Sequence, residues 1–86
     1  MNERQQLFEK ALQKCNELLG QYPDNGALLS IARQIEYLHG LETGVNTDRS
    51  RLKEIIIGVL TAREIEPLDE EAAELFYKVS GEAKRM

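Results

Sequence analysis

Apolar residues along most of the chain recur three and four positions apart, a spacing that is typical of amphipathic helices. No stretch of strand length shows the alternation of apolar and polar residues that a β-strand requires. The pattern predicts four helices, at about residues 3–20, 26–43, 48–64 and 69–80. We therefore expect an all-α fold, a compact antiparallel bundle of about four helices, formed by residues 1–86 as one domain.

The first two predicted helices have clear ends and clear buried faces. Asn2 can cap the first helix, and Pro23 disfavours helix at Tyr22, so that a turn follows. The apolar arc of the first helix consists of Leu7, Phe8, Ala11, Leu12, Cys15, Leu18, Leu19 and Tyr22. The second helix has an apolar face of Leu28, Ile31, Ala32, Ile35, Leu38 and His39. Its opposite face carries a mixed stripe of Ser30, Gln34, Tyr37 and Leu41.

The third predicted helix is apolar over more than half of its circumference, which favours a central position in the bundle. We expect Asn46 or Thr47 to cap it and Gly58 to allow the close approach of another backbone, that of an adjacent helix. Asp69 is expected to cap the fourth helix, and Gly81 to end it. The pattern predicts a set of largely buried residues: Cys15, Leu52, Ile55, Ile56, Val59, Leu75 and Phe76.

The composition limits the function to the surface of the molecule. With 86 residues, 42% of them apolar, the chain can form one small core and has little material for a deep pocket. A net charge of −4 argues against nucleic acid as a partner. No stretch approaches the length of a membrane span, and the first residues lack the apolar segment of a signal peptide. We expect a cytoplasmic protein with no membrane partner and no indication of a homo-oligomer.

Catalytic chemistry has little support in the sequence. The only histidine is His39, and the only cysteine, Cys15, lies in the middle of an apolar helix face, so neither has an evident catalytic partner. The turns lack the ligand spacing of a calcium loop, and no glycine-rich phosphate loop is present. The sequence therefore predicts no enzyme, no cofactor and no metal site.

Two surface features are candidates for binding a protein partner. Residues 63–74 contain six acidic residues and one basic residue, a local charge of −5, and within this cluster the candidate contacts are Glu64, Glu66, Asp69 and Glu70. Such a cluster can steer a basic partner, although acidic residues also stabilise the first turn of a helix. The second feature is the mixed stripe with Gln34 and Tyr37, which either contacts a partner or packs on another helix of the bundle.

Several short motifs lie in a fixed order and spacing over about residues 7–80: Tyr22-Pro23, Leu28-Leu29-Ser30, Gln34-x-x-Tyr37, Asp48-Arg49-Ser50-x-Leu52, Gly58 and Arg63-Glu64-Ile65. In this order and spacing the chain resembles the small all-helical immunity proteins that neutralise type VI secretion effectors with NAD(P)⁺ hydrolase activity. The resemblance implies a bacterial antitoxin that binds the toxin domain of a cognate effector and blocks its active site. An acidic helix link could then occupy a pocket built for an anionic dinucleotide.

An alternative is a helical adaptor of tetratricopeptide type that binds a peptide or a partner subunit. Ala11 and Pro23 have the separation of two signature positions in that repeat. The next repeat does not follow, because Arg33 falls where a small residue belongs and Glu36 where an aromatic residue belongs.

Overall fold

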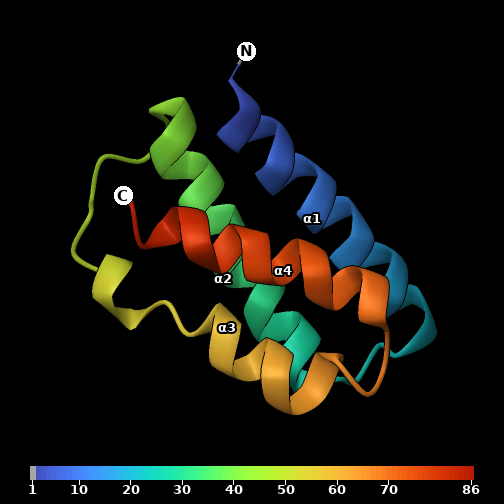
Figure 1. Ribbon diagram of the computed structural model, residues 1–86. Helices are drawn as coiled ribbons and strands as arrows, with labels where there is room; N and C mark the ends of the chain where they lie inside the picture. The colour runs from blue at the N-terminus through green and yellow to red at the C-terminus, as the bar shows by residue number, and fades with distance from the viewer. Residues whose placement is uncertain (1) are drawn as a thin grey trace.

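The computed structural model describes residues 2–86, which form four α-helices and two shorter helical turns (Figure 1). The α-helices are α1 (Glu3–Gln21), α2 (Gly26–Thr43), α3 (Ile57–Leu60) and α4 (Glu70–Ala83). The two turns are η1 (Leu52–Glu54), a 3₁₀ turn, and η2 (Thr61–Ile65), a π-helical turn that continues α3. The prediction of an all-α bundle of about four helices is confirmed.

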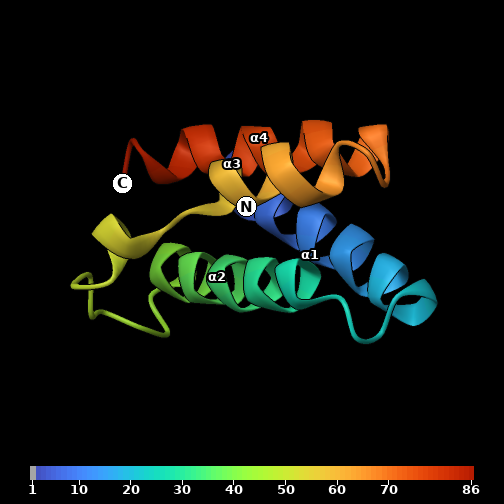
Figure 2. The same ribbon diagram turned by 90° about the horizontal axis from the view of Figure 1, so that it is seen from below.

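Successive helices run in opposite directions, and α3 is wedged between two layers. Figure 2 shows α4 in one layer and α2 in the other, with α3 and η2 lying between them along one side of the molecule. The helix α1 packs against both α2 and α4. Residues 44–56, called here the link, run along the outside from the end of α2 to the start of α3 (Figure 1).

The hairpin of α1 and α2 forms as the sequence predicts. The Asn2 side chain accepts a hydrogen bond of 2.6 Å from the Gln5 N–H, which caps α1. Pro23 follows the last turn of α1, and Asn25 then caps α2 through the Leu28 N–H at 3.0 Å. The helices bury facing apolar side chains: Phe8, Ala11, Cys15 and Leu18 from α1, and Leu28, Ile31, Ala32, Ile35 and Leu38 from α2.

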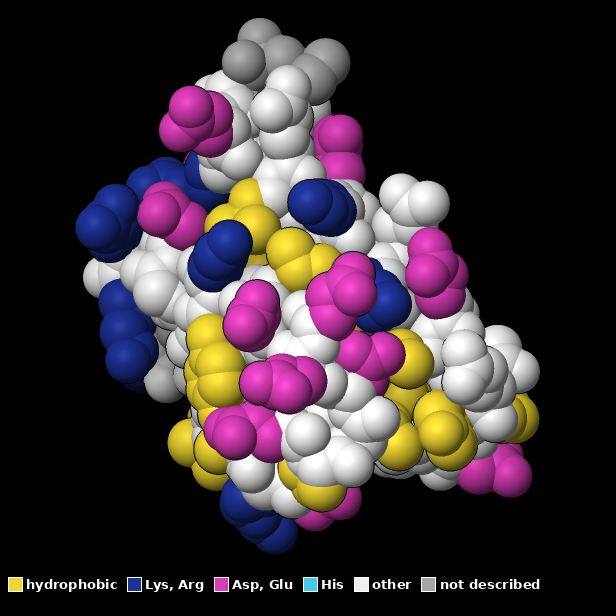
Figure 3. Space-filling view, turned by 45° about the vertical axis from the view of Figure 1, so that its right-hand side comes forward, with side chains coloured by type: hydrophobic (Ala, Val, Ile, Leu, Met, Phe, Trp, Pro, Cys, Tyr) yellow, Lys and Arg dark blue, Asp and Glu magenta, His cyan; other side chains and the backbone are white. Residues whose placement is uncertain are grey.

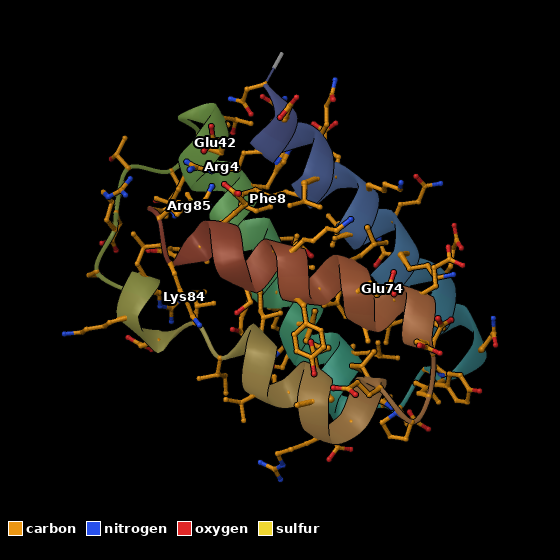
Figure 4. All side chains as sticks on the ribbon, in the orientation of Figure 1. Arg4, Phe8, Glu42, Glu74, Lys84 and Arg85 are labelled. Carbon is orange, nitrogen blue, oxygen red and sulfur yellow. The ribbon has the colours of Figure 1, made fainter. Side chains whose placement is uncertain are left out.

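At the end of the bundle away from the turn between α1 and α2, an arginine on α1 forms ion pairs with α2 and α4. Arg4 contacts Glu42 at 3.1 Å and Glu82 at 3.0 Å, so its guanidinium joins the start of α1 to the ends of α2 and α4. Hydrogen bonding to Glu82 and then to Glu42 raises the pKa of Arg4 above its ordinary value. Figure 4 shows Arg4, Glu42 and Arg85 at this end of the molecule.

The fourth helix begins as predicted but ends later. The Asp69 side chain accepts a hydrogen bond of 3.0 Å from the Ala72 N–H and caps α4. The prediction that Gly81 ends the helix is wrong, because α4 continues to Ala83. Ala83 packs against the core and Glu82 bonds to Arg4, so tertiary contacts hold the last turn in helical form despite the glycine.

The prediction of a continuous third helix over residues 48–64 is also wrong. Neither Asn46 nor Thr47 caps a helix, and the regular part of this region is confined to η1, α3 and η2. Side chains near the expected start favour turns instead: Asn46 accepts from the Asp48 N–H and Asp48 accepts from the Ser50 N–H, each at 3.0 Å. Such bonds to the backbone two residues ahead compete with helix formation.

Two further backbone groups of the link are bound by side chains of α2. The Arg51 N–H donates to the Tyr37 hydroxyl at 3.2 Å, and the Ile56 N–H donates to Gln34 Oε1 at 2.8 Å. These N–H groups would bond to carbonyls four residues back in a continuous helix. Long-range contacts thus replace helical hydrogen bonds in the link. The spacing of apolar residues along the sequence does not reveal such contacts.

The segment formed by α3 and η2 buries one narrow row of side chains. Ile57, Thr61 and Ile65 are each 0% exposed and lie four residues apart. Every fourth residue of an α-helix drifts by about 40°, because one turn takes 3.6 residues. The π-helical turn, with its hydrogen bond of 3.0 Å from the Glu66 N–H to the Thr61 carbonyl, widens the helix and keeps the row facing the core.

The predicted core is therefore correct in part. Cys15 and Phe76 are fully buried, whereas Leu52, Ile55 and Leu75 are partly buried against the core. Ile56 and Val59 were expected in the core and are 49% and 54% exposed, because α3 turns only the row of Ile57 inward. An adjacent helix does approach Gly58 closely, but through a side chain and not its backbone, since a Cβ there would lie 2.9 Å from Ser80 Oγ on α4.

The neighbouring residues Ile56 and Ile57 provide a test of which side of α3 faces the core. We expect Ile57→Ala to lower the free energy of unfolding by about 2–5 kcal/mol, because it removes fully buried methylene groups and leaves a cavity. Ile56→Ala removes the same groups from a half-exposed side chain and should lower it by less than about 1 kcal/mol. Urea unfolding of both variants measures the difference. Equal losses would contradict the arrangement, as would unfolding of an Ile56→Asp variant.

Candidate protein-binding surface

The outer face of α3 carries an exposed apolar strip. Ile56 and Val59 are 49% and 54% exposed, and Tyr77 on α4, which is 38% exposed, lies beside them. Together with exposed Ala62 these residues line a shallow hollow between α3 and α4. Exposed apolar side chains that gather on one face of a small domain mark an interaction site. This group of Ile56, Val59, Ala62 and Tyr77 is called the apolar strip below.

A pocket of about 250 Å³ lies at one end of the apolar strip, between α2 and the link. Its lining residues are Ser30, Arg33, Gln34, Tyr37, Arg51, Glu54, Ile55 and Ile56. Ile56 belongs both to this pocket and to the apolar strip, so the two features form one continuous surface. We call this hollow the α2 pocket.

The structure places Gln34 and Tyr37 in the wall of the α2 pocket. The Tyr37 hydroxyl donates to the Asp48 carbonyl at 2.7 Å and accepts from the Arg51 N–H. Gln34 binds the Ile56 backbone through its oxygen and donates from Nε2 to Ser30 Oγ at 3.0 Å. The polar atoms of the mixed stripe therefore hold the link against α2, while both side chains remain partly exposed.

The acidic residues gather at the opposite end of the apolar strip. Glu64 lies in η2, Glu66 directly follows it, and Asp69 and Glu70 begin α4. Figure 3 shows a group of acidic side chains in the middle of the face that it presents, with lysine and arginine side chains above it, at the left edge and at the bottom. Glu74 lies further along α4 and is also exposed (Figure 4).

The four candidate acids differ in their surroundings. Asp69 caps α4 and lies 3.8 Å from Lys14 Nζ, so its charge already has structural partners. Glu66 accepts a hydrogen bond from the Tyr77 hydroxyl, and this bond raises the pKa of Tyr77. Glu64 and Glu70 are exposed and make no side-chain hydrogen bond or ion pair within residues 2–86. The bond between Glu66 and Tyr77 joins the acidic end to the apolar strip.

The candidate residues therefore lie at two ends of one surface rather than in one cluster. Sequence reasoning missed the apolar strip between the two ends, because it assigned Ile56 and Val59 to the core. It also missed Arg33 and Arg51, which line the α2 pocket. One signal was present: the apolar residues of the third helix covered more of its circumference than a small core can bury.

Cys15 and His39, the residues with the most obvious catalytic chemistry, each make a contact between α1 and α2. Burial raises the pKa of the Cys15 thiol to about 11, and the thiol donates a hydrogen bond of 3.2 Å to the Leu28 carbonyl. At neutral pH the thiol is therefore protonated and is a poor nucleophile. His39 contacts Glu9 at 3.0 Å across α1 and α2, and this hydrogen bond holds the pKa of Glu9 below its ordinary value.

Residues 2–86 contain no group of three histidine, cysteine or acidic side chains that could hold a metal ion. None of the helices within the same range has the length and apolar content needed to cross a bilayer.

The fold defines a small all-α protein, and its surface offers a candidate site for binding another protein. A model of the Tsi6 family matches residues 3–85, and the chain belongs to this family. This result confirms the resemblance to the immunity proteins of type VI effectors and favours it over the tetratricopeptide-like adaptor. The family is one of immunity proteins and is not known for enzymatic activity.

Two solved structures have the same fold. A structure of Tse6 in complex with Tsi6 contains a chain that superposes with a TM-score of 0.90 and 23% identity, covering 98% of this chain and 89% of that one. A structure of Tsi6 from Pseudomonas aeruginosa gives a TM-score of 0.83 and 24% identity, covering 92% of this chain and 91% of that one. A search of curated proteins finds no match.

The role of Gln34 in holding the link can be tested without a partner. Gln34→Ala should increase hydrogen exchange at the Ile56 amide and lower the free energy of unfolding by about 0.5–1.5 kcal/mol, because one tertiary hydrogen bond is lost. Exchange measured by NMR at single residues detects this change. Glu36→Ala, an exposed change on the same helix, is the control and should leave the Ile56 amide protected. Unchanged protection in Gln34→Ala would show that the bond does not hold the link.

Proposed function

We propose that this chain is an immunity protein that binds the toxin domain of a cognate effector and inhibits it by covering its active site. It acts as one domain, residues 1–86, in the bacterial cytoplasm, and it has no turnover of its own. Membership of the Tsi6 family supports this role, as does the fold shared with a Tsi6 chain in complex with Tse6. The cognate toxin is an NAD(P)⁺ hydrolase in this proposal.

The observation that carries the proposal is the exposure of the apolar strip. Ile56 and Val59 each leave about half of their surface in water, although a domain of this size needs its apolar residues to form a core. Removing such side chains from water on binding contributes about 25 cal/mol for each Å² of apolar surface buried. In this proposal, burial of the strip against the toxin supplies the apolar part of the binding energy.

In this proposal the charged groups at the two ends of the strip raise the rate of association with the toxin and set the orientation of the complex. The acidic residues Glu64, Glu66, Asp69 and Glu70 suit a partner surface that is basic, such as the pocket of an enzyme that binds an anionic dinucleotide. In this proposal they lie against that pocket and exclude the dinucleotide. At the other end Gln34 and Tyr37 keep the α2 pocket in shape and offer short-range contacts to the toxin.

Inhibition by this chain should be stoichiometric and should depend on the apolar strip. One equivalent of the protein should stop NAD(P)⁺ consumption by the toxin domain encoded beside it. Val59→Asp should raise the concentration needed for inhibition by at least about tenfold, since a charge is placed at the buried centre of the interface. Val45→Asp is the matched control, because Val45 is 87% exposed and lies in the link away from the strip. Titration of toxin activity against each purified variant measures the effect.

Two outcomes of this titration would contradict parts of the proposal. Full toxin turnover at a molar excess of the parent protein would reject the immunity role for that pair. Inhibition with dinucleotide still bound to the toxin, seen by equilibrium dialysis, would reject coverage of the active site and favour a remote contact.

The acidic end should act on the rate of association. Four neutralising changes, Glu64→Gln, Glu66→Gln, Asp69→Asn and Glu70→Gln, should together slow association by about tenfold at low salt and flatten its salt dependence. Asparagine at position 69 keeps the helix cap, so stability should be preserved. Stopped-flow binding to an inactive toxin variant measures the rate.

A second quadruple variant controls for net charge. It neutralises exposed acids outside the acidic end: Glu3→Gln, Glu17→Gln, Asp24→Asn and Glu36→Gln. If both quadruple variants associate equally slowly, net charge rather than the position of the acids determines the rate. A parent rate that does not change with salt would remove electrostatic steering altogether.

A further inference from the structure

Two arginines with no ion-pair partner face the same pocket. Within residues 2–86, Arg4 and Arg85 form ion pairs with acidic side chains, and Arg49 donates to the carbonyl of Met86. The guanidinium groups of Arg33, Arg51 and Arg63 form no hydrogen bond or ion pair in that range, although the charge of Arg51 helps to lower the pKa of Asp48. Arg33 on α2 and Arg51 on the link are both exposed and line the α2 pocket.

The α2 pocket is held in its shape before any partner arrives. Three hydrogen bonds fix the link to α2: Ile56 N–H to Gln34, Arg51 N–H to the Tyr37 hydroxyl, and Tyr37 to the Asp48 carbonyl. The backbone of Arg51 is thus anchored while its side chain remains free to contact a partner. A preformed pocket binds with a smaller loss of conformational entropy than one that must be ordered.

The lining of the pocket indicates what it can receive. Ile55, Ile56 and the Tyr37 ring supply apolar walls, and the two guanidinium groups supply donors that suit a carboxylate. Its volume of about 250 Å³ is small, on the scale of side chains rather than of a whole helix. Glu54 is the one acidic residue among those that line it, and its charge opposes a second carboxylate.

We propose that the α2 pocket is an anchor site for an acidic side chain, next to an apolar one, from the surface of the effector toxin domain. This inference rests on the proposed immunity function and adds the chemistry of one contact. The anchor site also fixes the orientation of the two proteins in the complex. The acidic end of the apolar strip meets a basic part of the toxin, and the arginine end meets an acidic part, so a reversed arrangement brings like charges together.

A pair of charge reversals in the link tests the anchor site. Arg51→Glu should raise the Kd for the inactive toxin domain by at least about tenfold, because an acidic partner group would face a like charge. Lys53→Glu makes the same change in net charge two residues away, at a position that does not line the pocket, and should change the Kd by less than about threefold. Arg33→Glu, on a different element, should weaken binding as Arg51→Glu does. Isothermal titration calorimetry measures each Kd.

A change of opposite sign strengthens the test. Glu54→Gln removes the one negative charge of the pocket lining and should lower the Kd by about threefold. Equal effects of Arg51→Glu and Lys53→Glu, or weaker binding by Glu54→Gln, would overturn the anchor site. Thermal melts confirm that each variant is folded.

The outcomes separate this inference from the proposed function. If the parent binds the toxin, Val59→Asp abolishes binding and Arg51→Glu binds like the parent, then the anchor site is wrong and the immunity role stands. If the parent itself does not bind or inhibit the toxin, then the proposed function fails and the anchor site falls with it.

Discussion

The buried row of Ile57, Thr61 and Ile65 is the constraint on which the remaining structure depends. α1, α2 and α4 already supply most of the core, so the segment of α3 and η2 fully buries only this row, while Leu60 packs against the core in a partly buried position. The hydroxyl of Thr61 donates to the Ile57 carbonyl at 2.7 Å, which lets a polar residue occupy the middle of that row. With the row fixed, the neighbouring apolar residues Ile56 and Val59 must face water, and the surface proposed to bind a partner is a direct consequence.

The mixed stripe of α2 supplies hydrogen-bond acceptors to the backbone of the link. A link of this length carries many backbone N–H groups that need partners. Gln34 and Tyr37 supply acceptors for two of them, and they do so from a helix that also buries its other face in the core. The two interpretations of this stripe, internal packing and partner contact, are therefore compatible, since the residues that fix the link also shape the α2 pocket.

The sequence predicts α1, α2 and α4 well because local signals determine them. Asn2, Pro23 and Asp69 act on the backbone within a few residues, and their caps and breaks hold in the structure. The third helix was mispredicted because side chains from α2 compete for its hydrogen bonds, an effect between residues 14 and 22 positions apart. The candidate site shows the same difference between local and long-range signals. Its acidic end could be predicted from the local composition, whereas the apolar strip depended on which face of α3 is exposed.

The fold sets how the surface can change among relatives. A backbone that superposes with a TM-score of 0.90 at 23% identity keeps its helices in place while most side chains differ. Core volume must be preserved under such change, because packing errors of one methylene already cost stability. Exposed positions carry no such restriction. Partner choice is therefore expected to depend on residues such as Val59, Arg51 and Glu64, where apolar contact gives affinity and the placement of charge rejects a wrong partner. An immunity protein that must recognise one toxin can thus acquire a new specificity on α3 and the link without any change in the bundle that supports them.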